Sequence, residues 1–176
     1  MISELKLVLL SKDDETNYYE MLDDFLSHGE HIDLFGIGYE NRDFEMLLKR
    51  LKENELGVKF KEGFAPNSTY YLRINNGKLL GLFNLRHSLS PELLIDGGHI
   101  GYAVRPSERG KGLSHEILRQ GLGVALEMGL SKVMLSVDLM NKPSISVIEK
   151  QNGILEEEKM IQGKLSRNYW IYLTDS

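Results

Sequence analysis

The chain has 176 residues, of which 41% are hydrophobic and 27% charged, a composition typical of one globular domain with its own core. Its formal net charge of −5 argues against a general nucleic-acid binder, and the absence of cysteine excludes disulfides, thiolate zinc sites and a cysteine nucleophile. We expect a cytoplasmic protein with no membrane partner, because no apolar run is long enough to span a bilayer and no signal-peptide pattern opens the chain.

One strand and two helices are predicted in the first third of the chain. Residues 5–10 have the pattern of a strand, and Ser11 with Asp14 three residues later is typical of a helix start. Apolar side chains then recur at helical spacing, at Tyr18, Leu22, Phe25 and Leu26. Asn41 can cap a second helix, whose apolar positions are Phe44, Leu47, Leu48 and Leu51.

A β-hairpin and a further strand follow. Residues 70–74 and 78–85 are strand-like, and Asn75-Asn76-Gly77 between them supplies the positive φ angles that a tight hairpin turn needs. Residues 99–105 predict the next strand, and Pro106 limits its further pairing because proline has no backbone N–H.

A glycine-rich basic turn joins this strand to a helix. Gly110 and Gly112 let the backbone approach a ligand closely, while the N-terminus of the helix and the side chains of Arg109 and Lys111 add positive charge. This combination predicts an anion site that binds phosphate groups. The alternative is an ordinary strand–turn–helix connection.

Two common phosphate-binding motifs are excluded at this turn. A P-loop would need glycine in place of Arg105 and serine or threonine in place of Gly112. A dinucleotide-binding fingerprint would need a third glycine where His115 stands.

The last third predicts two helices and three strands. The first helix follows the turn with an apolar face formed by Leu113, Ile117, Leu118, Leu122, Ala125 and Met128. Gly121 and Gly123 within it each cost about 1 kcal/mol relative to alanine, and small residues there allow close packing on a sheet. Residues 132–138 predict a strand, 141–150 a short helix, and 155–161 and 169–173 two closing strands. The whole order is that of a mixed α/β (α+β) domain with the anion turn directly after its fourth strand.

The turn and its flanks resemble the GNAT superfamily of N-acetyltransferases. Its pyrophosphate loop has the pattern Gln or Arg, two residues, Gly, one residue, then Gly or Ala, and here Ser107 departs from the first position while Gly110 and Gly112 match. A second block, Asn141 and Ser144 followed by 148–150 and Gly153, is similar too. The strand segment 97–102, with the sequence GGHIGY, resembles a group of bacterial proteins described as predicted acetyltransferases. The resemblance implies one N-acetyltransferase domain over residues 1–176, with a mostly antiparallel sheet that is splayed between strands 4 and 5 and flanked by helices.

The same resemblance implies acetyl-CoA as the donor, a primary amine of a small molecule or peptide as the acceptor, and no metal. It implies that the backbone around Ala103 and Val104 pairs with the pantetheine arm of CoA and polarises the thioester carbonyl. The pyrophosphate would lie on Arg109, Gly110, Lys111, Gly112, Leu113 and Ser114. Asn141 is either a further CoA contact or simply a helix cap before Pro143.

Histidine at position 99 is the candidate general base. The resemblance places glutamate in many family members at this point of the fourth strand, and the ordinary pKa of histidine, about 6.5, suits proton removal near neutral pH. The alternative is a half-buried histidine that holds the adjacent loop by hydrogen bonds.

Three further positions carry weaker hypotheses. Arg86 either binds a substrate carboxylate or forms a surface ion pair, and His87 is expected beside the site at the end of the third strand. Ile148 stands where many family members have a tyrosine that protonates the leaving thiolate, so the sequence offers no acid at that position.

The acceptor amine is not identified by the sequence. Acidic residues gather between positions 13 and 33, where they either attract a cationic amine or form a solvated helix face. A non-catalytic acyl-CoA-binding module is the main alternative to an enzyme, a longer acyl donor is a second alternative, and a homodimer is compatible with either.

Overall fold

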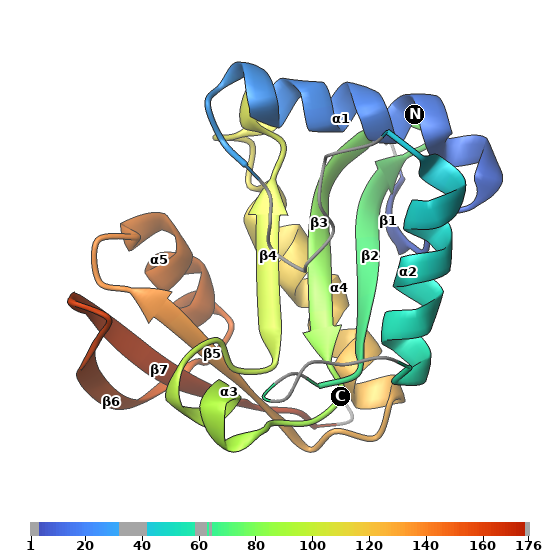
Figure 1. The fold of residues 1–176 in the computed structure, drawn as a ribbon. Helices are drawn as coiled ribbons and strands as arrows, with labels where there is room; N and C mark the ends of the chain where they lie inside the picture. The colour runs from blue at the N-terminus through green and yellow to red at the C-terminus, as the bar shows by residue number, and fades with distance from the viewer. Residues whose placement is uncertain (1–3, 32–41, 59–62, 64, 175–176) are drawn as a thin grey trace.

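Two antiparallel sheets form the framework of the computed structural model, which describes residues 4–31, 42–58, 63 and 65–174 (Figure 1). The first sheet has the order β1-β2-β3-β4, made of Leu5–Val8, Asn67–Ile74, Leu79–Arg86 and Ile100–Val104. The second has the order β5-β7-β6, made of Lys132–Asp138, Lys164–Tyr172 and Ile154–Ile161. The expected antiparallel pairing of the sheet is confirmed.

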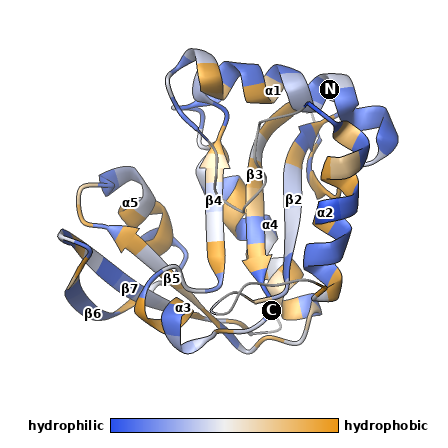
Figure 2. Ribbon diagram, viewed as in Figure 1, coloured by the Kyte–Doolittle hydropathy of each residue, from blue (hydrophilic) through white to orange (hydrophobic). Residues whose placement is uncertain are grey.

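Helices cover both faces of the first sheet. Helices α1 (Glu15–Ser27) and α2 (Phe44–Leu56) lie on one face, and α4 (Leu113–Glu127) lies on the other (Figure 1). Alternate residues of β3 point to opposite faces, so Leu82 packs with α1 and α2 while Phe83 and Leu85 pack with α4. Figure 2 shows that hydrophobic and hydrophilic residues are interspersed along α1, α2 and α4.

Most element boundaries agree with the sequence analysis, and the exceptions are local. The hairpin turn is confirmed, with Gly77 at φ +89°. Asp43 rather than Asn41 caps α2 by accepting a hydrogen bond from the Met46 N–H, and Asn41 lies outside the described residues. Strand β7 begins at Lys164, five residues earlier than predicted, because a tight turn through Gly163 pairs it with β6 from its first residue.

A short helix, α3 (Pro91–Ile95), was absent from the predicted order. It has only 5 residues, too few for a helical periodicity to be read in the sequence. Its start is nevertheless encoded, because the Ser90 hydroxyl accepts a hydrogen bond from the Leu93 N–H and Pro91 occupies the first turn.

The two sheets separate between β4 and β5, as predicted. In the described residues β4 and β5 are joined by an isolated bridge between Gly98 and Leu135, after which the strands diverge. Helix α5 (Lys142–Lys150) follows β5, so the opening lies between β4 and α5 (Figure 1). Among the described residues, no helix is long and apolar enough to cross a membrane.

Gly121 and Gly123 provide a matched test of how α4 packs. A Cβ added to the buried Gly121 would lie 2.2 Å from Cε2 of Phe83, whereas one added to the exposed Gly123 would meet no atom within 4 Å. We expect Gly123→Ala to stabilise the protein by about 1 kcal/mol through helix propensity. We expect Gly121→Ala to destabilise it by about 1–3 kcal/mol through overpacking. Chemical denaturation measures both, and stabilisation by Gly121→Ala would contradict the close approach of α4 to β3.

Candidate functional site

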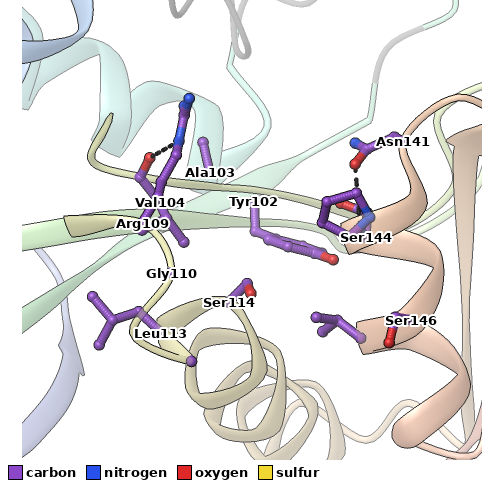
Figure 3. A pocket seen from close by; sticks show the side chains of 13 residues that line it. Tyr102, Ala103, Val104, Arg109, Gly110, Leu113, Ser114, Asn141, Ser144 and Ser146 are labelled. Carbon is purple, nitrogen blue, oxygen red and sulfur yellow. Dashed lines mark hydrogen bonds between the residues drawn. The ribbon is translucent and has the colours of Figure 1, made fainter. Parts of the chain in front are cut away.

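A groove of about 680 Å³ lies where β4 and β5 diverge (Figure 3). Its walls come from three places that are far apart in the sequence: the end of β4, the turn before α4, and the first turns of α5. The lining residues are Tyr102, Ala103, Val104, Arg109, Gly110, Gly112, Leu113, Ser114, Asn141, Pro143, Ser144, Ser146 and Val147. The groove thus contains most of the residues that the sequence analysis selected for CoA.

The glycine-rich turn has the geometry of an anion cradle. Gly110 and Gly112 have φ angles of +79° and +76°, and a Cβ added to either would meet no atom within 4 Å. Gly112 is the N-cap of α4 and offers no side-chain acceptor. Among the described residues, no hydrogen-bond partner is found for the N–H groups of Gly110, Lys111, Gly112, Leu113 and Ser114. A run of unpaired N–H groups at a helix N-terminus binds phosphate oxygens well.

The two cations of the turn are already paired with carboxylates. Arg109 forms a two-pronged ion pair with Glu30, with N···O distances of 2.6 and 2.7 Å, and this hydrogen bonding raises the pKa of Arg109 and lowers that of Glu30. Lys111 pairs with Glu108 at 2.6 Å, which lowers the pKa of Glu108. The positive potential expected from these side chains is therefore largely compensated, and the backbone N–H groups carry the anion site.

On the edge of β4 that faces the groove the N–H groups have no partner among the described residues, while the carbonyl oxygen of Val104 accepts a hydrogen bond from Arg109 Nε at 3.2 Å. Arg105 N–H donates to Leu80 O and Arg86 N–H donates to His99 O, which fixes the hydrogen-bonded register between β3 and β4. Hydrogen-bonded pairs alternate in antiparallel strands, so the N–H of Ala103 faces β3 while those of Tyr102 and Val104 face the opening. The N–H groups available to a ligand on this edge are therefore those of Tyr102 and Val104, and Ala103 lines the groove without offering its N–H. Pairing of this backbone with pantetheine stays a prediction.

Asn141 is a helix cap that also lies at the groove, so the predicted CoA contact stays a prediction. Its Oδ1 accepts a hydrogen bond from the Ser144 N–H at 3.2 Å and so caps α5, and the residue also lines the groove (Figure 3). Ser144, Ser146 and Val147, which the sequence analysis did not select, line the groove beside it. Ser144 and Val147 lie three residues apart on α5, the helical spacing that places two side chains on one face.

His99 lies at the point where the two sheets part, and its surroundings do not support the predicted base role. It is 6% exposed, does not line the groove, and its Nδ1 accepts a hydrogen bond of 2.9 Å from the Met134 N–H. The backbone N–H of His99 donates to Met134 O at 2.7 Å. Burial, reinforced by the nearby Arg86 charge, lowers the pKa of His99 to about 4. The imidazole of His99 is therefore neutral at pH 7 and uses Nδ1 as an acceptor within the fold. This agrees with the alternative interpretation, a buried histidine that holds the adjacent loop by hydrogen bonds.

Arg86 and His87 also have structural positions. Arg86 donates from Nη1 to the carbonyl oxygens of Gly97 and Gly98, at 3.1 and 2.9 Å, so it forms neither the surface ion pair nor the open carboxylate site expected. Its half-buried guanidinium holds the glycine loop before β4, and burial lowers its pKa. His87 lies on the other side of β3 from β4, with its Nε2 2.9 Å from the hydroxyl of Ser68. Neither residue lines the groove.

Ile148 is a core residue. It is 1% exposed, and a Cβ on Gly153 would lie 2.5 Å from its Cγ2, so no space exists there for a tyrosine. The expectation that this position supplies no acid agrees with the packing.

Several acidic residues of the N-terminal region form ion pairs with arginine side chains. Asp14 pairs with Arg73 at 3.0 Å, Asp24 with Arg105 at 2.6 Å, and Glu30 with Arg109. Asp33 lies outside the described residues. In the part of the chain that the structure describes, no group of three or more metal-binding side chains is present.

Comparisons with known proteins agree with the geometry of the groove. The model of the family described as "Acetyltransferase (GNAT) family" matches residues 33–154. No curated protein matches the chain. Solved structures with a similar fold include one named "Probable acetyltransferase", with a TM-score of 0.68 at 17% identity over 96% of this chain and 92% of the other. Another is spermidine N-acetyltransferase from Vibrio cholerae in complex with CoA and spermine, with a TM-score of 0.63 at 16% identity over 96% and 95% of the two chains. At these identities the likeness shows a shared fold.

The depressed pKa of His99 predicts a specific pH dependence of stability. Between about pH 6.5 and pH 4 the unfolded chain, with an ordinary histidine pKa, binds a proton that the folded protein does not. The free energy of unfolding should therefore fall as the pH drops through this window, and the His99→Gln variant should lack this part of the slope.

Denaturation of both proteins from pH 4 to 7, with an NMR titration of His99, measures the effect. At pH 7 we expect His99→Gln to cost about 1–3 kcal/mol, because the variant disturbs the acceptor of a buried N–H. A His99 pKa near 6.5 would contradict the structural assignment and restore the base role.

Proposed function

The chain belongs to the acetyltransferase (GNAT) family, and from this premise we propose that it moves an acetyl group from acetyl-CoA directly to a primary amine of a small molecule or peptide. Family membership makes the protein an N-acetyltransferase with acetyl-CoA as the donor. The acceptor, the roles of individual residues and the extent of the domain over residues 1–176 belong to the proposal. The observation that carries it is the run of unpaired N–H groups at Gly110–Ser114 beside the unpaired N–H groups on the edge of β4.

The groove fits acetyl-CoA by the chemistry of its walls. The N–H groups of the turn would hold the pyrophosphate, which needs donors and close backbone approach more than it needs lysine or arginine. The unpaired N–H groups of Tyr102 and Val104 would donate to carbonyl oxygens of the pantetheine arm, as one strand pairs with another. Asn141 and Ser144 face the same space from α5.

Acyl transfer makes two demands on the residues near the thioester. An N–H group must stabilise the negative charge that develops on the carbonyl oxygen, and the unpaired N–H groups on the β4 edge are suited to this. The amine must lose a proton, yet none of the described residues that line the groove is a histidine or a carboxylate. We therefore assign proton removal to solvent water and to no side chain.

The acceptor class is an amine whose structure the groove does not specify. The Vibrio cholerae neighbour is an acetyltransferase of spermidine, so polyamines belong among the first amines tested. Asp14, Asp24 and Glu30 give no separate support for a cationic acceptor, because they already have arginine partners. A cytoplasmic location and a homodimer stay predictions.

Gly110 and Gly129 provide a matched test of CoA binding. They stand at opposite ends of α4 with φ angles of +79° and +87°, and a Cβ on either meets no atom within 4 Å. Alanine should therefore strain both positions by a similar amount, about 1–2 kcal/mol. We expect Gly110→Ala to weaken CoA binding by about tenfold or more, since its methyl group occupies the phosphate cradle, and Gly129→Ala to bind CoA as the wild type does. Calorimetry measures the affinity of each variant for CoA. Equal affinities for Gly110→Ala and Gly129→Ala would contradict the assignment of the turn as the phosphate site.

An amine screen tests catalysis separately from binding. The chain has no cysteine, so CoA thiol released from acetyl-CoA can be followed with a thiol reagent without a protein background. We expect release that depends on an amine from a panel of spermine, spermidine, butylamine, phenethylamine, an aminoglycoside and a short peptide. Tight CoA binding with no release for any amine would favour the acyl-CoA-binding module instead.

A further inference from the structure

Glu30 holds the arginine that lines the groove. Arg109 is the residue directly before the glycines of the anion cradle, and its Nη1 and Nη2 donate to the two carboxylate oxygens of Glu30 at 2.6 and 2.7 Å. Its Nε donates to Val104 O at 3.2 Å, on the edge of β4 that faces the groove. All three nitrogens of the guanidinium therefore have partners within the protein.

The end of α1 fixes the position of Glu30. Gly29 follows the helix with a φ of +70°, a left-handed conformation that glycine adopts without strain. This turn lets the N–H of Glu30 donate to Phe25 O at 3.0 Å, which closes the end of the helix. The backbone of Glu30 is therefore held in place, and its carboxylate meets Arg109 between α1 and the glycine-rich turn.

Asp24 attaches the turn to α1 by separate contacts. Its side chain is only 9% exposed and accepts a hydrogen bond from Arg105 Nε at 2.6 Å and another from the hydroxyl of Ser107. The side chains of Glu30 and Arg109 are 41% and 47% exposed, so water screens their attraction. The position of the cradle thus depends mainly on Asp24, and the pair between Glu30 and Arg109 can open without moving the turn.

A pyrophosphate group would exchange readily with the Glu30 carboxylate. An exposed ion pair contributes little net stability, because water solvates both partners well when they separate. A guanidinium binds phosphate oxygens through two parallel N–H groups, as it binds a carboxylate. A ligand amide that donates to Val104 O would also displace Arg109 Nε from this carbonyl. A ligand along β4 therefore loosens the second contact that holds the guanidinium.

We propose that Glu30 sets the affinity for CoA by competing with its pyrophosphate for the guanidinium of Arg109. The proposal rests on the proposed function. The backbone N–H groups of the cradle bind the pyrophosphate in either case, and Arg109 adds its contact only when Glu30 releases it. Part of the binding free energy is thus spent on opening the ion pair, so Glu30 weakens the hold on CoA. Since CoA is also the product, a weaker hold favours its release after acetyl transfer.

Calorimetry with CoA on the wild type and Glu30→Gln tests the sign of the effect. Glutamine has a similar volume and keeps one acceptor oxygen, but it has no charge to hold Arg109. We expect the variant to bind CoA about fivefold more tightly, the size of one exposed ion pair. Weaker binding would show that Glu30 is a brace on which the site depends, and unchanged binding would show that it does not compete. Both results overturn the proposal.

A double-mutant cycle shows whether Glu30 acts through Arg109. Loss of any negative charge near a polyanion such as CoA favours binding at long range, with no exchange of partners. We therefore expect Glu30→Gln to change the affinity by less than about twofold when Arg109→Gln is already present. An equal gain with and without Arg109 would be a long-range charge effect and would overturn the proposal.

Glu116→Gln is the matched control. Glu116 lies in the first turn of α4 and pairs with Arg119, which does not line the groove. The substitution removes one carboxylate near the cradle without releasing an arginine of the groove, so CoA affinity should stay within about twofold of the wild type. A gain as large as that of Glu30→Gln would again point to charge alone and overturn the proposal.

Dephospho-CoA, which lacks the 3′-phosphate and keeps the pyrophosphate, identifies the group that takes Arg109. We expect Glu30→Gln to tighten binding of CoA and dephospho-CoA by the same factor. A gain with CoA alone would mean that Arg109 moves to the 3′-phosphate, which overturns the proposal. A wild type that binds neither ligand would instead refute the proposed function, so the two failures are distinguishable.

Discussion

The separation of β4 from β5 is the feature on which the rest of this structure depends. The ladder between them stops because a side chain takes the place of a backbone carbonyl: His99 Nδ1 accepts from the Met134 N–H, next to the bond from His99 N–H to Met134 O. Gly98 makes this possible, since its φ is +64° and a Cβ there would lie 2.4 Å from Met134 O. Arg86 holds the same loop through the carbonyl oxygens of Gly97 and Gly98. Beyond this point β4 has no partner strand on this edge, which here borders the groove and whose one hydrogen bond found among the described residues runs from Arg109 Nε to Val104 O.

The anion cradle depends on backbone rather than on charge. Its glycines and the N-terminus of α4 supply donors that are fixed in direction, while Arg109 and Lys111 are held by Glu30 and Glu108. Similar pairs connect α1 to the turn at its C-terminal end, where Asp24 binds Arg105 and the hydroxyl of Ser107. Asp24 and Glu30 therefore fix the turn against α1, and the cradle is formed before any ligand arrives. Preorganised donors of this kind lose little entropy when they bind.

The candidate site could be predicted wherever its chemistry is local. Gly110 and Gly112 are visible because a phosphate cradle needs glycine at fixed spacing next to a helix start, and Asn141 because a cap needs a short polar side chain before the helix. The roles of His99 and Arg86 could not be decided from the sequence, because both residue types are equally suited to catalysis and to buried hydrogen bonding. Only burial and the partners Met134 and Gly97 distinguish the two uses.

By itself the sequence determined the order of strands and helices, the hairpin at Gly77, the anion turn and the family. These follow from periodicity, turn chemistry and glycine spacing, which act over a few residues. Tertiary structure alone decided the short helix at Pro91–Ile95, the ion pairs that neutralise the turn, and which face of β4 borders the groove. Each of these depends on contacts between residues far apart in the chain, such as Glu30 with Arg109 or His99 with Met134, and no local pattern encodes them.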